Sequence, residues 1–463
     1  MRYFAGFSLP FLAASLVLAA GCAEDATPAT GAGDADAAES ADGAADTAGD
    51  VPAAIPVSDA GGGLPAGDLK IGTPTELFDP LGMHVVQVTL DPADWQKYLA
   101  GAAGPDSHKT YDYYKASVTF DGIPYTNLAI KGFGNGSQLE NPKKPNIRIK
   151  FDHFDPNLTG PEKEHAFRLK ASGQDPTFLR EPISSSLVRS LGGHAPRFSW
   201  ATVKVNGEDY GPYQLQESVD KRMYSHDFGN NDGNSYQTLI ACVGLDCAPG
   251  KCDVLKSTYV GEPGIATGTA DGHELAEIGQ AIATSTPETL PAVLAEKLGL
   301  DGFLSDYAVE AVLSDLDGLA AAGQNFTFYI DEKSAKLHIV RTGSDLTFGN
   351  LGNAFYDLSA PWGLPNSWCP KRADQLYLKI ANSPPLKQQL DAKFRALQCG
   401  IFKNTTLVPI TQQYQAALKP WIYKDPKGLY NGKDNELDAA YLKLRNYVEK
   451  RQKTLLDRLG PCP

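Results

Sequence analysis

The chain lacks the short motifs that mark several common classes of enzyme. It contains neither the GxSxG sequence of α/β-hydrolases nor the HExxH sequence of zinc proteases, and its eight histidines show no metal-ligand spacing. It also lacks an excess of basic residues, because 42 Lys and Arg stand against 55 Asp and Glu, a net charge of −13. This balance argues against nucleic acid as a partner.

Long hydrophobic runs are missing after the first twenty residues, so the sequence predicts no transmembrane helix there. Residues 1–21 have a basic start and a short apolar run, which predicts an export signal. The run ends in LAAGCAED, which resembles a bacterial lipobox before Cys22. We therefore expect a lipid anchor on Cys22 that holds the protein to a membrane in the bacterial cell envelope, outside the cytoplasm. Ordinary secretion is the alternative.

Residues 22–72 are poor in everything that builds a core. From Cys22 to Lys70 there is no aromatic residue, and ten acidic residues stand against one lysine. A segment dominated by Ala, Gly and Asp buries too little apolar surface to offset chain entropy. We expect a disordered tether that carries most of the acidic excess, followed by one folded domain at residues 73–463.

Cysteine is scarce, and its use fits an exported protein. Apart from Cys22, the sequence has an even number of cysteines in two clusters, which favours up to three disulfides of undetermined pairing. These candidates are Cys242, Cys247, Cys252, Cys369, Cys399 and Cys462. The first cluster lacks the paired CxxC spacing and the obvious fourth ligand of a zinc site, so a metal is the weaker interpretation.

The first half of the folded part carries the pattern of β-strands between clusters of Gly, Pro, Asn and Asp. The segments that fit are residues 84–90, 115–120, 127–133, 146–152, 165–171 and 200–206. One helix interrupts them. Because Pro182 fits only within a first turn, this helix is expected to begin at Leu179 to Glu181 and to stop at Gly192.

The second half changes to helical periodicity. The segments that fit are residues 272–283, 291–300, 301–316, 385–399, 410–422 and 438–460. A strand-rich N-lobe with one helix, at about 80–217, and a helical C-lobe, at about 218–463, together predict an α+β fold with a cleft between its halves.

The stretch VKVNGEDYGPYQLQESVDKRMY at 203–224 resembles the most recognisable part of the CotH family, the spore-coat protein H kinase-like proteins. Other pieces follow in matching order, among them IKGFGNGSQ, KKPNIRIKFD, FLREPISSSLVRSLG and DLTFG. The resemblance implies a two-lobed atypical protein-kinase-like fold that binds ATP with Mg (or Mn) between the lobes. It also implies transfer of phosphate to Ser or Thr of secreted or surface proteins.

In this resemblance the N-lobe supplies the phosphate-binding groups. Gly132, Gly134 and Gly136 would form a hairpin over the phosphates, although flexible turn glycines explain the same pattern. On the next strand Lys150 is the expected phosphate-binding cation, and Glu181 its expected partner. A solvated sheet face and a favourable helix dipole are the alternatives for these two residues.

The segment between the lobes and the polar residues after it complete the expected site. Backbone groups of Gln216, Glu217 and Ser218 would meet the adenine. A side chain of Glu217 that simply caps or pairs with the following segment is the alternative.

Three residues of the C-lobe take the roles that phosphoryl transfer requires. Asp317 would accept the proton of the substrate hydroxyl, and Asn325 and Asp345 would bind the metal. The alternative is that Asp315 and Asp317 only cap or end a helix.

Two departures from the family pattern bear on activity. Asp317 and Asn325 are eight residues apart, a longer spacing than in relatives, and TGSD stands where relatives have WDxD, so that Gly343 replaces a carboxylate. A non-catalytic pseudokinase that serves as a surface-binding or structural lipoprotein is therefore the alternative function.

Overall fold

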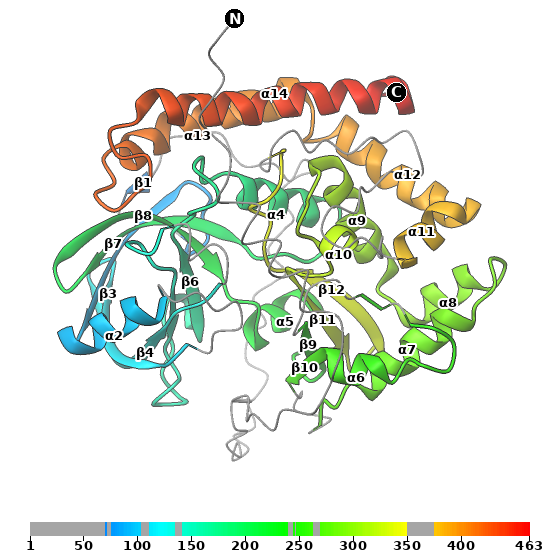
Figure 1. Ribbon diagram of the computed structural model, residues 1–463, viewed down its shortest axis with the longest axis horizontal. Coiled ribbons are helices and arrows are strands. Elements are labelled where there is room, and N and C mark those ends of the chain that lie inside the picture. The colour runs from blue at the N-terminus through cyan, green and yellow to red at the C-terminus, as the bar shows by residue number, and fades with distance from the viewer. Residues whose placement is uncertain are drawn as a thin grey trace, which may run out of the picture. The chain divides into compact units, whose positions relative to one another are not determined.

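The computed structural model describes residues 70–71, 76–102, 111–134, 141–238, 244–245, 247–262, 269–349 and 375–463 (Figure 1). Several predictions fall outside these residues: the export signal, the lipid anchor on Cys22, the roles of Gly136, Cys242 and Cys369, and the tether apart from residues 70–71. Residues 70–71 form a short strand, so the expected end of the tether at residue 72 was too late. Within the described ranges no helix is both long enough and apolar enough to cross a membrane.

The strand-rich half is a closed barrel. Its sheet has the order β1-β2-β3-β4-β5-β6-β8-β7, and β2 also pairs with β7 in parallel, so that seven strands form a ring. The strands are β1 (Lys70–Ile71), β2 (Gly82–Leu90), β3 (Tyr114–Phe120), β4 (Ile123–Lys131), β5 (Ile147–Lys150), β6 (Ala166–Lys170), β7 (Phe198–Val205) and β8 (Glu208–Glu217). The six strands predicted from the sequence correspond to β2–β7.

Two tight turns show why the hairpins form where they do. Asp121 and Gly122 link β3 to β4 with φ values of 46° and 83°, and Asn206 and Gly207 link β7 to β8 with 50° and 84°. Two-residue loops with positive φ at both positions match the twist of the flanking strands, and Asp-Gly and Asn-Gly adopt them readily. The Asn-Gly turn at 206–207 lies within the stretch that resembles the CotH family.

The barrel strands have two chemically different faces. Residues such as Ile147, Ile149, Phe167 and Leu169 fill the barrel core, where α2 (Pro92–Ala102) adds two aromatic side chains. Because side chains alternate along a strand, the intervening residues of β5 and β6 point outward. These outward residues are cationic: Arg148, Lys150, Arg168 and Lys170.

The predicted helix between the strands is α4 (Arg180–Ser190). It begins as expected, with Leu179 as its N-cap and Pro182 in its first turn. The Asp175 carboxylate accepts from the backbone N–H of Arg180 at 2.8 Å, which satisfies one of the free donors at the helix start. Glu181 is consequently held at the buried first turn of α4.

The second half is mixed rather than purely helical. It contains an antiparallel sheet of order β10-β9-β11-β12, made of β9 (Asn234–Thr238), β10 (Tyr259–Glu262), β11 (Phe326–Asp331) and β12 (Lys336–Arg341). Its helices are α5 (Lys221–Phe228), α6 (Val254–Thr258), α7 (His273–Thr284), α8 (Leu290–Lys297), α9 (Leu300–Leu313), α10 (Leu319–Ala322), α11 (Gln375–Asn382), α12 (Pro384–Cys399), α13 (Asn404–Tyr423) and α14 (Asp434–Leu459). The six predicted helices correspond to α7, α8, α9, α12, α13 and α14. The α+β class is confirmed.

The C-terminal helices return to the barrel. Figure 1 draws α13 and α14 side by side, and they pack on each other. Tyr414 of α13 donates to the carbonyl of Pro80 at 3.1 Å, and Tyr441 of α14 donates to the carbonyl of Thr177 at 3.0 Å. The division into a strand-rich and a helical part that follow one another in sequence is therefore too simple, because the last helices cover the first part.

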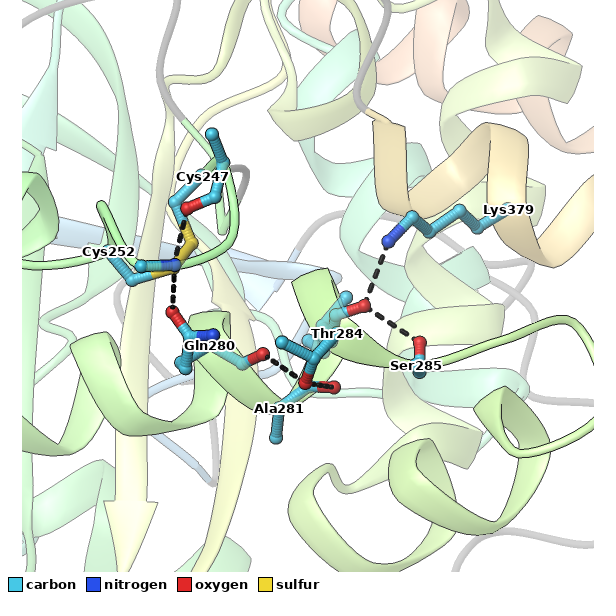
Figure 2. Close-up of a disulfide and its surroundings, with 10 residues drawn as sticks. Cys247, Cys252, Gln280, Ala281, Thr284, Ser285 and Lys379 are labelled. Carbon is cyan, nitrogen blue, oxygen red and sulfur yellow. Dashed lines mark hydrogen bonds between the residues drawn. A yellow bond between two sulfur atoms is a disulfide. The ribbon is translucent and has the colours of Figure 1, made fainter.

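Two disulfides lie within the described residues. Cys399 at the end of α12 bonds to Cys462, and Cys247 bonds to Cys252. Figure 2 shows the second disulfide beside α7, where the Gln280 side chain accepts from the backbone N–H of Gly250 at 2.8 Å. At the end of the same helix, Lys379 of α11 donates to the Ile282 carbonyl at 2.8 Å. The predicted use of cysteine for disulfides is thus confirmed for four of the six candidates.

Candidate functional site

The site begins with an ion pair at the end of strand β6. The Nζ atom of Lys170 lies 2.5 Å from Oε1 of Glu181 in α4 and 3.8 Å from Oδ2 of Asp345. Burial alone would lower the pKa of Lys170, but the charges of Glu181 and Asp345 outweigh it and raise the pKa. Burial, opposed by the charge of Lys170, raises the pKa of Glu181 to about 7. A buried cation therefore joins the strand, the helix and the segment after β12.

Glu181 was expected to pair with Lys150, and the structure gives it a different partner. Lys150 lies opposite Ala166 in the β5–β6 ladder, whereas Lys170 is four residues further along β6. At about 3.3 Å per residue, this separates the two lysines by roughly 13 Å along the strand. Lys150 instead lies near Asp152, whose pKa it helps to lower against the effect of burial. Both lysines point outward, and only the register decides between them.

Sequence reasoning missed Lys170, although a signal was present. The strand that ends in Lys170 directly precedes the helix that carries Glu181, and a strand followed by a helix brings neighbouring ends together. Lys150 was chosen because it follows the glycine-rich hairpin. Lys170 is closer in sequence to Glu181 than Lys150 is, and this proximity would have favoured Lys170 as its partner.

The segment after β12 is fixed by hydrogen bonds to α4. The backbone N–H of Ser344 donates to Oε1 of Glu181 at 3.1 Å, and the hydroxyls of Ser184 and Ser344 are 3.0 Å apart. The same carboxylate of Glu181 thus holds both Lys170 and the backbone beside Asp345. Asp345 is therefore a constituent of the site rather than a polar turn residue on the surface.

Asp317 and Asn325 meet despite the long spacing between them. The short helix α10 occupies most of the intervening residues and brings the chain back, and Nδ2 of Asn325 donates to Oδ2 of Asp317 at 2.6 Å. The side chain of Gln324 donates to the other oxygen of Asp317. Burial, and then the charges of Asp345 and Asp315, raise the pKa of Asp317 to about 8. The negative charge of Asp345 therefore acts on Asp317.

A buried arginine holds the segments that carry these aspartates. Arg341, the last residue of β12, donates from Nη1 to Asp315 at 2.6 Å and from Nε to Asp306 of α9 at 2.8 Å. Its Nη2 lies 3.6 Å from Glu310, whose carboxylate also caps α10 through the backbone N–H groups of Leu319 and Ala320. Burial, and then the charge of Asp306, raise the pKa of Glu310 well above its usual value. Asp315 is thus a structural partner of Arg341.

Gly343, at the position where the family resemblance led us to expect a carboxylate, packs closely against Asn325. A Cβ atom added at this position would lie 3.0 Å from Oδ1 of Asn325. A side chain at 343 would therefore require Asn325 to shift. The observed position of the Asn325 amide therefore depends on having no side chain at residue 343.

The predicted interlobe segment lies at the end of β8. The Glu217 carboxylate accepts from Nη2 of Arg197 and from Nε2 of His226, each at 2.6 Å. Burial would raise the pKa of Glu217, but Arg197 and His226 outweigh it and lower the pKa to about 2. The Glu217 side chain thus fastens this segment to β7 and α5.

Two neighbours of Glu217 carry polar atoms without partners. Gln216 donates from Nε2 to the carbonyl of Thr342 at 3.3 Å. Its Oε1 atom and the Ser218 hydroxyl are buried, and neither has a hydrogen-bond partner in the part of the chain that the structure describes. Such atoms are available to a ligand.

The glycine-rich hairpin is described only in part. Gly134 has a φ of 87°, and its carbonyl accepts from the Tyr111 hydroxyl at 2.5 Å. A Cβ atom on Gly132 would lie 2.3 Å from the Tyr111 ring. These two glycines therefore allow the chain to pass under an aromatic ring, which is a packing reason for their presence.

The oxygen atoms of the site suit a divalent cation that is shared with phosphates. Among the described residues, no three His, Cys, Asp or Glu side chains form a group that could hold a metal alone. Mg²⁺ needs fewer protein ligands, because it keeps several waters and uses one or two carboxylates together with substrate phosphates. Asp345 and the Asn325 amide meet this requirement, and Asp317 lies beside them through its hydrogen bond with Asn325.

Comparison with known proteins relates the chain to a family of kinase proteins. The family model described as CotH kinase protein matches residues 129–455. Inner spore coat protein H of Bacillus subtilis (strain 168) is 33% identical over 86 residues, which are 19% of this chain and 23% of that protein. Invasin CotH7 of Rhizopus delemar is 23% identical over 301 residues, which are 64% of this chain and 49% of that protein. The matches thus span between about a quarter and half of the length of these relatives.

Among solved structures, the proinflammatory kinase CtkA of Helicobacter pylori aligns with 72% of this chain and 93% of its own, at 11% identity and a TM-score of 0.24. This score is too low to support any conclusion about the fold. The family assignment depends instead on the match at 129–455, which covers most of the chain and includes every residue of the site described above. The chain belongs to the CotH kinase protein family.

Proposed function

We propose that this protein is an atypical protein kinase that transfers phosphate from ATP, with Mg²⁺ or Mn²⁺, to Ser or Thr side chains of secreted or surface proteins. The observation that carries the proposal is the placement of Lys170 between Glu181 and Asp345. Phosphoryl transfer depends on a fixed cation for the phosphates and on oxygen ligands for a metal, more than on covalent chemistry. Membership of the CotH kinase family supports the same reaction.

The residues divide the work as follows. Lys170 binds the nucleotide phosphates, and Glu181 orients its ammonium group. Asp345 and Asn325 hold the divalent cation, which neutralises charge on the phosphates when bound. Asp317 accepts the proton of the substrate hydroxyl through its carboxylate, which Gln324 and Asn325 orient. The segment 216–218 contacts the adenine, with the Oε1 atom of Gln216 and the hydroxyl of Ser218 as acceptors.

We also propose that the protein resides in the bacterial cell envelope. The LAAGC sequence supports processing before Cys22 and attachment of lipid to this cysteine, which would hold the kinase at a membrane surface. Two disulfides support an oxidising compartment. The mass of the mature N-terminal peptide tests this: acylated Cys22 is the expected result, and an unprocessed or unlipidated N-terminus would contradict it.

A second candidate function is a pseudokinase that binds nucleotide or a protein partner without transfer. The observation that favours it is Gly343, which removes one carboxylate of the family pattern. Incubation with radiolabelled ATP and Mg²⁺ separates the two. Labelling of the protein or of a Ser-rich basic peptide, lost in Asp345→Asn, is expected for a kinase. A raised melting temperature without labelling would identify the pseudokinase. If ATP causes neither labelling nor a raised melting temperature, nucleotide binding is contradicted.

A further inference from the structure

A row of polar side chains crosses the outer face of the barrel beside Lys170. In the strand register Arg148 of β5 lies opposite Arg168 of β6, and Arg168 lies opposite Gln216 of β8. Cross-strand neighbours on one face are about 5 Å apart at Cβ. Arg168 is two residues from Lys170 on the same strand and therefore on the same face, roughly 7 Å away. The row is thus adjacent to the proposed kinase site but separate from its lysine.

The two arginines differ from Lys170 in having no anionic partner. Across the described ranges, neither guanidinium lies within ion-pair distance of a carboxylate, and the buried Nε atoms of both lack a hydrogen-bond acceptor. Arg168 is oriented by the Phe133 ring, whose centroid lies 5.4 Å from Cζ. The Oε1 atom of Gln216, which is 1% exposed, lacks a partner at the end of the row.

This arrangement is unfavourable in the free protein. Burial, and then the charge of Arg148, lower the pKa of Arg168 to about 10. The charge of Asp220 acts on both arginines and that of Glu181 acts on Arg168, in each case from beyond ion-pair distance, and Asp220 also accepts from the backbone N–H of Arg222 as the N-cap of α5. Half-buried like charges with unused donors normally occur where a ligand supplies the missing charge.

We propose that Arg148 and Arg168 together bind a phosphate group, as an anion site distinct from the Lys170 site. Paired guanidinium groups present planar sets of donors that match phosphate oxygens. The phosphate belongs either to the nucleotide or to a phosphorylated acceptor protein. The choice between these sources rests on the proposed kinase function, whereas binding of the anion does not.

Binding of inorganic pyrophosphate without metal, measured by isothermal titration calorimetry, tests the site. Titrations in the Lys170→Met background isolate the arginines from the lysine. Arg148→Gln and Arg168→Gln are each expected to weaken binding about tenfold or more, because each removes charged hydrogen bonds to the anion. Lys204→Gln, which removes one exposed charge from β7 of the same barrel, is the matched control and is expected to leave the affinity within about twofold. Equal affinities in all three variants would overturn the proposal.

Stability of the ligand-free protein provides an independent measurement. Arginines that served the fold would lower the melting temperature when replaced. Ligand-binding arginines with unbalanced charge are expected to leave it unchanged or raise it in Arg168→Gln. A lowered melting temperature together with unchanged pyrophosphate affinity would show that the pair is structural.

Competition identifies the source of the phosphate. In the Lys170→Met protein, ATP displaces pyrophosphate if the nucleotide fills the site, whereas ATP and phosphoserine bind together if a phosphorylated acceptor fills it. The experiment is also independent of transfer activity. Pyrophosphate binding that survives in Lys170→Met, in a protein that labels nothing, would support the anion site while contradicting the kinase proposal.

Discussion

Two buried clusters of charge lie near each other in this protein, and they are built differently. Around Arg341, the carboxylates of Asp306, Glu310 and Asp315 are bound by the guanidinium or by backbone N–H groups. Around Lys170, Glu181 accepts from the lysine and from the backbone N–H of Ser344, whereas the Asp317 carboxylate accepts from two neutral amides, those of Gln324 and Asn325. A closed network holds the fold together, and an open one is available to a ligand. This difference distinguishes carboxylates that hold the fold from those that are available to a ligand, even when they are close in sequence. Asp315, which pairs with Arg341, is of the first kind, and Asp317 is of the second.

The largest expected effect is on the closed network. Arg341→Met should lower the free energy of unfolding by about 3–5 kcal/mol, because it leaves several buried carboxylates without their cation. Urea denaturation measures this. Arg222→Met is the control, since Arg222 is partly exposed and lies 4.0 Å from Glu164, and it should cost less than about 1 kcal/mol. Similar losses in both variants would remove the distinction between the clusters.

Substitutions in the open network around Lys170 should change the phosphate-transfer activity. Lys170→Met is expected to reduce labelling by ATP at least about 100-fold, since it removes the fixed cation for the phosphates. Lys150→Met is the matched control on the same outer face and should keep most of the activity. The reverse result would restore the interpretation based on the sequence, in which Lys150 binds the phosphates.

The close contact between Gly343 and Asn325 gives an intermediate effect. Gly343→Asp restores the carboxylate of the family pattern but places a Cβ 3.0 Å from the Asn325 amide, so we expect a loss of about 1–2 kcal/mol in stability. Gly101→Ala in α2, where an added Cβ meets nothing within 4 Å, should instead stabilise by about 0.5–1 kcal/mol. Thermal unfolding distinguishes them, and a stabilised Gly343→Asp would show that the site accommodates the second acid.

The smallest effect is a pH dependence in the segment that joins the halves. Although burial opposes it, hydrogen bonds to Asp227 and Glu217 raise the pKa of His226 to about 9. The pKa of His226 in the folded state lies above its value of about 6.5 in the unfolded state. The contribution of protonated His226 to the free energy of unfolding is therefore complete below pH 6.5 and is lost as pH rises through about 9.

We therefore expect the stability difference between wild type and His226→Gln to be about 1–2 kcal/mol at pH 6 and to shrink toward pH 9.5. Urea denaturation at several pH values measures it. A difference that is constant or grows with pH would contradict the assignment.

Much of the fold was predictable because its signals are local. Alternating apolar residues located six strands, and Pro182 located the start of α4. The closure of the barrel was not predictable in this way, because the parallel pairing of β2 with β7 joins Met83 to Trp200. Such pairing depends on the whole arrangement of strands rather than on any segment.

The site was predictable in part for the same reason. Asp317, Asn325, Glu181 and Asp345 were selected through the family resemblance, and the structure pairs Asn325 with Asp317 and places Glu181 and Asp345 beside Lys170. The lysine that pairs with Glu181 was not predicted correctly. Lys150 and Lys170 have equivalent positions in the alternation of strand side chains, and only the ladder register shows which one reaches Glu181. The helix α10 likewise explains a spacing that looked unfavourable in the sequence.

A crystal structure with Mn²⁺ and a non-hydrolysable ATP analogue is the most direct test of the central claim. We predict phosphate oxygens within hydrogen-bond distance of the Lys170 ammonium, and Mn²⁺ coordinated by Asp345 and Asn325. The claim would be contradicted by an analogue bound elsewhere, or by phosphates on Lys150 with Lys170 still paired only to Glu181.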